Sequence, residues 1–381
     1  MAPAQVATAS WINLQQVSMK WMYEPDFLAL RACLATVKGL DVDTTPIWLM
    51  LIGASGTGKT AYYMRCCESY PRYELTDEMS TAGLSSGKAG NWGDGLLKRL
   101  GTRGLWLMPD FTVFLNMREE RRNEVMGIQR RLFDGKYDRV AAGERLHWSG
   151  RLHVVAACTN ALERFYRVNA DLGERFIQVR IERRDASDEL IRKADAQRRH
   201  WQVFQDEIQE AAKAHIESTT ELPPVMPFEI ERKIMGWADF VSQGRISTHY
   251  NYKDELVSVG HQEGSSRLHQ QFTGMAVADA WLFGQDAASN FQVGLIERIA
   301  MDCLPWARRA ILQWFRTDDS LPLADVQEMS AITHPVTFRK AIEELVAIGA
   351  LILETSGSMT PEWNWQRSRV RLSPPLKKLL C

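Results

Sequence analysis

The chain has 381 residues, more than one hydrophobic core usually serves, so we expect about two or three domains. Apolar residues make up 45% and charged residues 24%, and no apolar run has the roughly 18 residues of a membrane helix, which indicates a folded, soluble protein without a membrane span. The formal net charge of −1 excludes nucleic-acid binding through a strongly basic whole chain, so any such binding must be local.

The N-terminus and the cysteines indicate the cellular compartment. The first ten residues lack a basic segment followed by an apolar core, so we expect no secretory signal and a cytoplasmic protein. The six cysteines are scattered and form no CxxC pair. This pattern predicts reduced thiols and neither a disulfide framework nor a zinc site.

The first half of the chain predicts an α/β domain. Residues 21–37 have apolar side chains at helical spacing, and turn formers separate them from an apolar strand at residues 48–52. Three further apolar segments have the character of buried parallel strands. They are residues 72–75, 104–108 and 152–158. With helical stretches between the strands, residues 1–185 are expected to form this domain.

The second half predicts two further regions. Residues 186–292 begin with a charged stretch of helical pattern, and we expect a helical lid domain. Residues 293–381 predict three helices followed by two strands, which is the pattern of a winged-helix domain. The expected helices lie near residues 306–315 and 323–330 and from Pro335, and the strands at 350–354 and 370–372.

A complete Walker A phosphate-binding loop directly follows the first strand. Such a loop needs glycines for tight turning, backbone amides that converge on an anion, a lysine for the outer phosphates and a hydroxyl for magnesium. All of these are present, so the sequence predicts binding of ATP and Mg²⁺. The expected ligands are Gly53, Ala54, Ser55, Gly56, Thr57, Gly58, Lys59 and Thr60.

The acid that should complete this site has an unusual form. An acidic strand end is expected to hold Mg²⁺ and polarise the attacking water, and here the strand ends in Pro109 and Asp110 instead of the usual Asp-Glu pair. We therefore expect Asp110 either to hold Mg²⁺ or to polarise the attacking water. The expected metal ligands are Thr60 and Asp110. The alternative acids are Glu119 or Glu120, which also fit a solvated helix face, and Asp77 or Glu78 at the end of the preceding strand.

Thr159 and Asn160 follow the third of the later strands. The Asn160 amide can position the lytic water beside the terminal phosphate. The alternative is a turn residue that caps the next helix. The order of strands and helices favours the catalytic interpretation.

The order of these motifs resembles that of the AAA+ ATPases over about residues 20–290. It runs from Walker A through an acidic strand end and Thr159-Asn160, in the place of sensor one, to the segment at residues 171–176. Within the superfamily the chain looks most like the minichromosome maintenance helicases and the enhancer-binding activators. Residues 128–140 are similar to their helix leading into a pre-sensor hairpin, which residues 140–148 would form with a turn at 141–143.

The resemblance implies roles for several basic residues. Arg175 corresponds to an arginine finger that reaches the ATP of a neighbouring subunit, although an arginine beside a glutamate is also typical of a surface pair. Arg267 corresponds to the sensor-two arginine of the lid. These assignments imply a homo-oligomeric ring, most often of six subunits. The hairpin lysine that touches DNA is replaced by Ala142, so the contact would fall to Lys136, Arg139 or Arg145.

Two other segments are candidates for contact with a substrate. Residues 83–88 fit a loop facing the pore of such a ring or a simple surface turn. In the expected winged helix, the helix from Pro335 is where groove-reading residues would lie. The candidate DNA contacts of this domain are Thr337, Arg339, Lys340, Arg367 and Arg369. Winged helices also mediate protein contacts, so this alternative stays open.

The sequence therefore predicts an oligomeric AAA+ ATPase that acts on DNA as a helicase, translocase or loader, in replication, a mobile element or defence. The alternative is an ATPase that remodels or regulates a protein partner docked on the winged helix. A third hypothesis, a slowly hydrolysing ATP switch, follows from the Pro109-Asp110 pair.

Overall fold

The computed structural model describes residues 3–77, 81–84, 95–141, 144–165, 175–315, 320–354 and 368–380. The chain divides into two compact units, which we describe separately. The first comprises Met1–Leu162, Arg175–Glu231 and Gln270–Ile296, and the second comprises Glu163–Glu174, Arg232–His269 and Glu297–Cys381. In the described part of the chain, no helix combines the length and apolar character needed to cross a bilayer.

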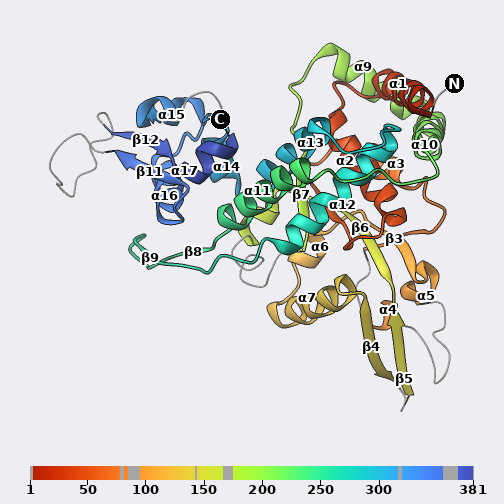
Figure 1. Cartoon of the computed structure of the whole chain (residues 1–381), viewed down its shortest axis with the longest axis horizontal. Coiled ribbons are helices and arrows are strands. Elements are labelled where there is room, and N and C mark those ends of the chain that lie inside the picture. Colours follow the sequence, from red (N-terminus) through yellow and green to blue (C-terminus); the bar gives the residue numbers. More distant parts are fainter. Residues whose placement is uncertain are drawn as a thin grey trace. The chain divides into compact units, whose positions relative to one another are not determined.

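A five-stranded, all-parallel sheet forms the centre of the first unit (Figure 1). Its order is β2-β3-β6-β1-β7. The strands at residues 48–52, 103–108 and 151–158 are mostly apolar and almost fully buried, as expected for parallel strands covered on both faces, and the strand at residues 177–180 is buried as well. The bounds are β1 Trp48–Ile52, β2 Tyr73–Leu75, β3 Arg103–Met108, β6 Arg151–Cys158 and β7 Ile177–Arg180.

Helices cover both faces of this sheet. On one face, the buried His153 of β6 contacts the Thr36 carbonyl of α2 (Phe27–Lys38) at 2.8 Å. On the other, Trp48 of β1 packs against Phe133 of α7 (Glu119–Phe133), with 5.4 Å between ring centroids. The sheet is thus the middle layer of an α/β unit, which confirms the predicted fold class at this level.

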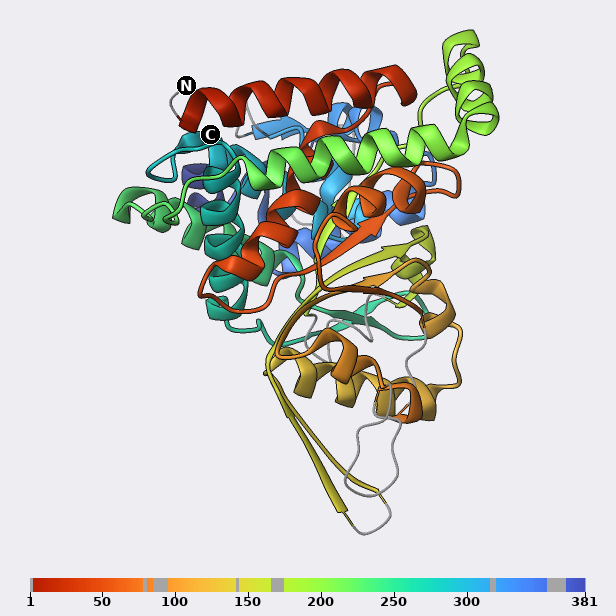
Figure 2. The ribbon, with the colours of Figure 1, turned by 90° about the vertical axis from the view of Figure 1, so that its right-hand side faces the viewer.

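The N-terminal helices differ from the prediction. The expected helix at residues 21–37 is the end of α1 (Pro3–Trp21), a connecting segment, and α2. Asp26 starts α2, because its carboxylate accepts hydrogen bonds from the backbone N–H groups of Leu28 and Ala29. Helix α1 lies beside α10 (Trp201–Glu217), and both run across the upper part of Figure 2, above the sheet.

A two-stranded hairpin extends away from the sheet in both Figures 1 and 2. Strands β4 (Lys136–Ala141) and β5 (Glu144–Ser149) pair in antiparallel register, with Tyr137 opposite Trp148. This confirms the expected hairpin, although it starts at Lys136 and is longer than predicted. The turn residues Ala142 and Gly143 lie outside the described residues.

Short helices complete the connections of the first unit. The π-helical segment η2 (Lys59–Met64) continues into α3 (Arg65–Cys67), and a 3-10 segment, η1 (Gly39–Asp41), follows α2. A second 3-10 segment, η3 (Asn160–Phe165), has residues in both units. The others are α4 (Thr81–Leu84), α5 (Leu96–Leu100), α6 (Thr112–Leu115) and α9 (Asp188–Arg199). Helices α11 (Phe228–Gly244), α12 (Ser266–Leu282) and α13 (Asn290–Asp302) each have residues in both units.

The second unit contains a three-stranded antiparallel sheet in the order β10-β12-β11, with three helices preceding its last two strands. The helices are α14 (Trp306–Leu312), α15 (Leu323–Met329) and α16 (Pro335–Ala347); the strands are β10 (Ser320–Pro322), β11 (Leu351–Glu354) and β12 (Arg369–Leu372), followed by α17 (Pro374–Leu380). Pro335 starts α16 at the position where a missing N–H costs nothing.

A ribbon of β8 (Thr248–Tyr250) and β9 (Leu256–Val259) also belongs to this unit. The sequence predicted only helices in this region, so the ribbon corrects that expectation. Buried Arg308 of α14 connects the chain before this ribbon to α16. Its guanidinium donates to the carbonyls of Gly244 and Ile246 at 2.8 Å and pairs with Glu344 of α16 at 3.0 Å.

Candidate functional site

The predicted phosphate loop lies between β1 and a helix. Gly56 and Gly58 have φ of 81°, in the left-handed region that glycine adopts without a steric penalty. A Cβ at Gly53 would lie 2.6 Å from the Ile181 carbonyl oxygen, so a side chain there has no room. The backbone N–H groups of Tyr62 and Tyr63 both donate to the Gly58 carbonyl, at 2.9 and 3.2 Å, and this pairing produces the π-helical first turns of η2.

Lys59 folds back over the loop. Its ammonium donates to the carbonyls of Gly53 at 2.8 Å and Ala54 at 2.6 Å, and lies 3.5 Å from the Thr57 hydroxyl. Burial lowers the pKa of Lys59, and the nearby Asp110 opposes that shift. The loop thus holds a half-buried cation through neutral oxygen acceptors.

Strand order brings the predicted acid to this loop. Strand β6 lies between β1 and β3, and parallel strands end at one edge of the sheet, so Asp110 and Thr159 face the loop. A pocket of about 360 Å³ is open between them. It is lined by Ser55, Gly56 and residues 58–61 on one side and by Pro109, Asp110 and residues 157–159 on the other.

Asp110 has a defined conformation in this pocket. One carboxylate oxygen accepts from the Thr112 N–H at 2.9 Å, and the Asp110 N–H donates to the Asp77 carboxylate at 2.7 Å. Of the alternative acids, Glu119 and Glu120 are exposed on the first turn of α7 and do not line the pocket. Glu78 lies outside the described residues.

The pocket offers oxygen donors suited to magnesium. The Thr60 hydroxyl and the Asp110 carboxylate both line it, on opposite sides. Mg²⁺ is commonly held by one or two carboxylates together with the phosphates of the substrate. The donor set therefore fits Mg²⁺ bound with a nucleotide.

Asn160 is exposed at the start of η3 and does not line the pocket, whereas its neighbour Thr159 does. The Thr159 hydroxyl accepts from the Ala161 N–H at 3.3 Å, so it also starts this helical turn. Both interpretations of Asn160 therefore stay predictions.

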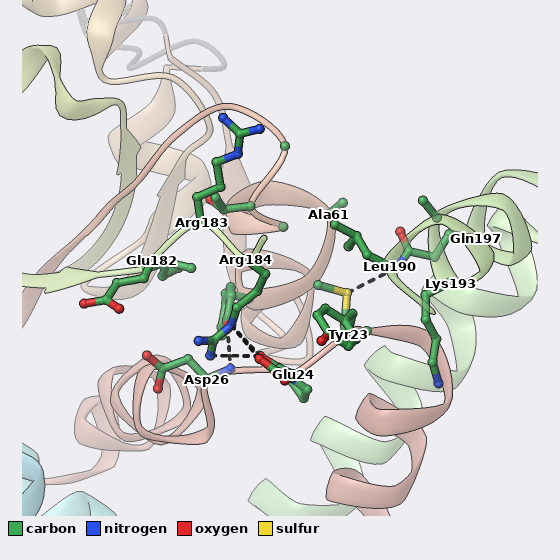
Figure 3. Close-up of a pocket in the computed structure, with 18 of the residues that line it drawn as sticks. Tyr23, Glu24, Asp26, Ala61, Glu182, Arg183, Arg184, Leu190, Lys193 and Gln197 are labelled. Carbon is green, nitrogen blue, oxygen red and sulfur yellow. Dashed lines mark hydrogen bonds and ion pairs between the residues drawn. The ribbon is translucent and has the colours of Figure 1, made fainter. Parts of the chain in front are cut away.

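A second pocket, of about 390 Å³, lies on the other side of the same loop (Figure 3). It shares Ser55, Gly56, Gly58 and Ala61 with the first pocket. Its other walls are residues 22–26, which connect α1 to α2, and parts of residues 181–197, which follow β7. The two pockets thus both border the loop.

Hydrogen bonds hold the two walls of the second pocket together. Figure 3 shows the Arg184 side chain directed at Glu24, whose carbonyl accepts from the guanidinium at 3.1 and 3.3 Å. Gln197 donates to the sulfur of Met22 at 3.2 Å. Glu24 has a φ of 43°, a strained conformation for a residue other than glycine, and such strain is common beside ligand sites. Sequence reasoning missed this pocket because it assigned residues 22–26 to a helix and did not predict β7.

The two arginines implied by the resemblance lie in different units. Arg175 precedes β7 in the first unit, and its carbonyl accepts from Gln271 at 3.3 Å. Arg267 lies in the second unit and pairs with Glu263, four residues earlier in the chain, at 2.6 Å. Their expected roles across subunits stay predictions.

The candidate nucleic-acid residues of the hairpin have different settings. Lys136 is exposed at the base of the hairpin, opposite Ser149, whereas Arg139 is half-buried and lies nearer the turn. The backbone of Arg145 belongs to β5, and its side chain lies outside the described residues. Most of residues 83–88 also lies outside them.

The candidate residues of α16 and β12 are engaged within the second unit. Lys340 pairs with Asp254 of the β8–β9 ribbon at 2.6 Å, and Arg339 pairs with Glu343 at 3.5 Å. Arg369 donates to the Ser320 carbonyl at 2.8 Å. Thr337 is half-buried, and Arg367 lies outside the described residues. Arg339, Lys340 and Arg369 thus already have partners.

No protein-family model matches the chain, and a search of curated proteins found no match to it.

Proposed function

We propose that this protein is a P-loop ATPase that binds Mg²⁺-ATP at the carboxyl edge of its parallel sheet. The observation that carries this proposal is the pocket where Lys59 and Thr60 of the loop lie opposite Asp110. Loop amides and the Lys59 ammonium would hold the phosphates, and the Thr60 hydroxyl and Asp110 carboxylate would hold Mg²⁺. A magnesium ion there neutralises charge that develops on the transferred phosphoryl group.

The second pocket is the proposed site of the nucleoside. It adjoins the loop through Ser55, Gly56 and Gly58, so a nucleotide with its phosphates on the loop can extend into it. Tyr23 and Met22 supply an aromatic and a polarisable surface for a base. The connecting segment between α1 and α2 would then contact the bound nucleotide.

Within this class, we propose an AAA+ ATPase that assembles into a ring, most often of six subunits. The sheet order supports it, since β6 brings Thr159 and Asn160 between the loop strand and the Asp110 strand. Arg175 would act on the ATP of a neighbouring subunit, and Arg267 would be the sensor-two arginine of the lid. Such a ring would work in the cytoplasm.

The proposed substrate is DNA, moved, unwound or loaded at the expense of ATP. Support comes from the long β4–β5 hairpin with exposed Lys136, and from the helices and antiparallel sheet of the second unit, which fit a winged helix. The deciding experiment measures ATP turnover of the purified chain with and without single- and double-stranded DNA at low salt, because phosphate contacts weaken as salt rises. Stimulation by DNA is expected; turnover without DNA binding or stimulation would overturn this part of the proposal and leave the ATPase.

One observation favours a second candidate function. Lys340 and Arg339 are paired with carboxylates, as expected for a surface not primarily shaped to hold DNA phosphates. An ATPase that remodels or regulates a protein partner docked on this unit fits that feature. A partner that changes ATP turnover in nuclease-treated protein would select this candidate.

A further inference from the structure

Asp77 lies beside the acid of the proposed magnesium site without lining the pocket itself. The chain runs alongside β3 for two residues beyond the end of β2. The Thr76 N–H donates to the Leu107 carbonyl at 3.0 Å, and the Trp106 indole donates to the Thr76 carbonyl at 2.9 Å. These bonds hold Asp77 next to Asp110.

The N–H of Asp110, at the end of β3, has its acceptor in a side chain and not in a strand carbonyl. Pro109 has no N–H, so the ladder of hydrogen bonds is interrupted immediately before Asp110. The Asp77 carboxylate accepts from the next N–H, that of Asp110, at 2.7 Å. On the other side, the Phe111 N–H donates to the Ala157 carbonyl of β6 at 2.8 Å. The backbone of Asp110 is thus held from both neighbouring strands.

We propose that Asp77 is a positioning residue that fixes the backbone of Asp110 and so directs the Asp110 carboxylate at Mg²⁺-ATP. The proposal rests on the function proposed above, in which Asp110 is a magnesium ligand. Groups that orient a metal ligand commonly change metal affinity or activity about 10- to 100-fold when they are removed. Asp77 thereby compensates for the proline that replaces the first acid of the usual pair.

A competing role for Asp77 is that of general base for the lytic water. Burial raises the pKa of Asp77, which would also suit a base. Two substitutions separate the roles. Asp77→Asn keeps an oxygen that accepts from the Asp110 N–H but removes the charge, whereas Asp77→Ala removes both.

The first measurement needs neither metal nor nucleotide. Amide hydrogen exchange of the Asp110 N–H is compared in the wild-type chain, Asp77→Asn, Asp77→Ala and Glu74→Ala. The last is a matched control, because it removes a carboxylate from β2 that pairs with Arg99 at 2.9 Å. Faster exchange is expected in Asp77→Ala alone, and wild-type exchange in that variant would overturn the proposal.

The second measurement titrates Mg²⁺ and follows both binding of a fluorescent ATP analogue and ATP turnover. Asp77→Ala should need about 10- to 100-fold more Mg²⁺, bind the analogue normally in EDTA, and lose turnover at limiting Mg²⁺. Asp77→Asn should behave as the wild type. If Asp77→Asn keeps the protected amide and yet loses turnover at saturating Mg²⁺, charge is required and the positioning role is overturned.

The two proposals fail in distinguishable ways. If the wild-type chain binds no ATP analogue, the proposed function fails, and the inference about Mg²⁺ falls with it. If the wild type binds and hydrolyses ATP but Asp77→Ala has an unchanged Mg²⁺ requirement, only the role of Asp77 is overturned.

Discussion

The phosphate loop and the surface of α16 both present lysines that the sequence assigns to phosphate binding, yet their partners differ. Lys59 donates to main-chain carbonyls, whereas Lys340 pairs with the Asp254 carboxylate and lies 4.9 Å from the Tyr250 ring. Neutral carbonyls give way easily to a phosphate, but a carboxylate competes with it. Lys59 of the loop is therefore available to a bound anion, whereas Lys340 of α16 is already paired with the Asp254 carboxylate.

The size of this competition depends on exposure. A hydrogen bond to a charged group contributes about 1.5–3 kcal/mol where water is excluded, whereas an exposed ion pair contributes about 0–1 kcal/mol. Asp254 is well exposed, and its pairing with Lys340 lowers its pKa. Pairing on α16 should thus weaken DNA binding modestly and not abolish it.

Removing the loop lysine should give the largest effect. We expect Lys59→Ala to lose ATP binding, weaker by about 100-fold or more, because no other side chain on the loop carries a positive charge. Titration with a fluorescent ATP analogue measures this. Lys20→Ala is the matched control, since it removes a lysine paired with Glu207 on the surface of the same unit. Equal affinities of the two variants would contradict the proposed site.

A buried histidine should also make the stability of the first unit, which contains the parallel sheet and the loop, sensitive to acid. His153 is fully buried, its Nδ1 donates to the Thr36 carbonyl, and burial lowers its pKa to about 3. The unfolded chain takes up this proton near pH 6.5 and the folded chain does not, so the free energy of unfolding should fall by a few kcal/mol as pH drops from about 6.5 to about 3.

Denaturant unfolding followed across this pH range tests the expectation. His153→Gln should be less stable at pH 7, since it loses the fitted ring, but its stability should depend less on pH. Asp254→Asn, on the exposed ribbon, should leave the slope between pH 7 and 5 unchanged. A His153→Gln slope equal to that of the wild type would show that another group carries the acid sensitivity.

The smallest effect is expected on α16. Asp254→Asn should free Lys340 and tighten DNA binding up to about five-fold at low salt, with the gain lost at high salt. Fluorescence anisotropy with labelled duplex measures it. Glu255→Gln is the control, because it removes the same charge from the same ribbon, where Glu255 accepts from Asn251. If Asp254→Asn and Glu255→Gln bind DNA with equal affinity, pairing with Asp254 does not restrain Lys340, and the proposed difference from Lys59 is wrong.

Local pattern predicted much of the fold. Continuous apolar runs identified β1, β3 and β6, and Pro335 identified the start of α16. By contrast, β7 was missed because Gln178 and Arg180 make it resemble an exposed segment, although pairing with β1 leaves them 1% and 8% exposed. Helix α1 was missed. Its last residue, Trp21, was joined with α2 into one predicted helix, because the connecting segment resembles a continuing helix.

Residues 53–60 alone were enough to predict a phosphate loop, because the glycines, Lys59 and Thr60 are contiguous and the loop conformation depends on only a few residues. Which acid lies beside that loop, and which residue supports it, became visible in the folded chain. Asp77 and Asp110 are 33 positions apart, and the second pocket joins residues 22–26 to residues 181–197. Such contacts depend on the order in which parallel strands pair, which the apolar runs of the individual strands do not encode.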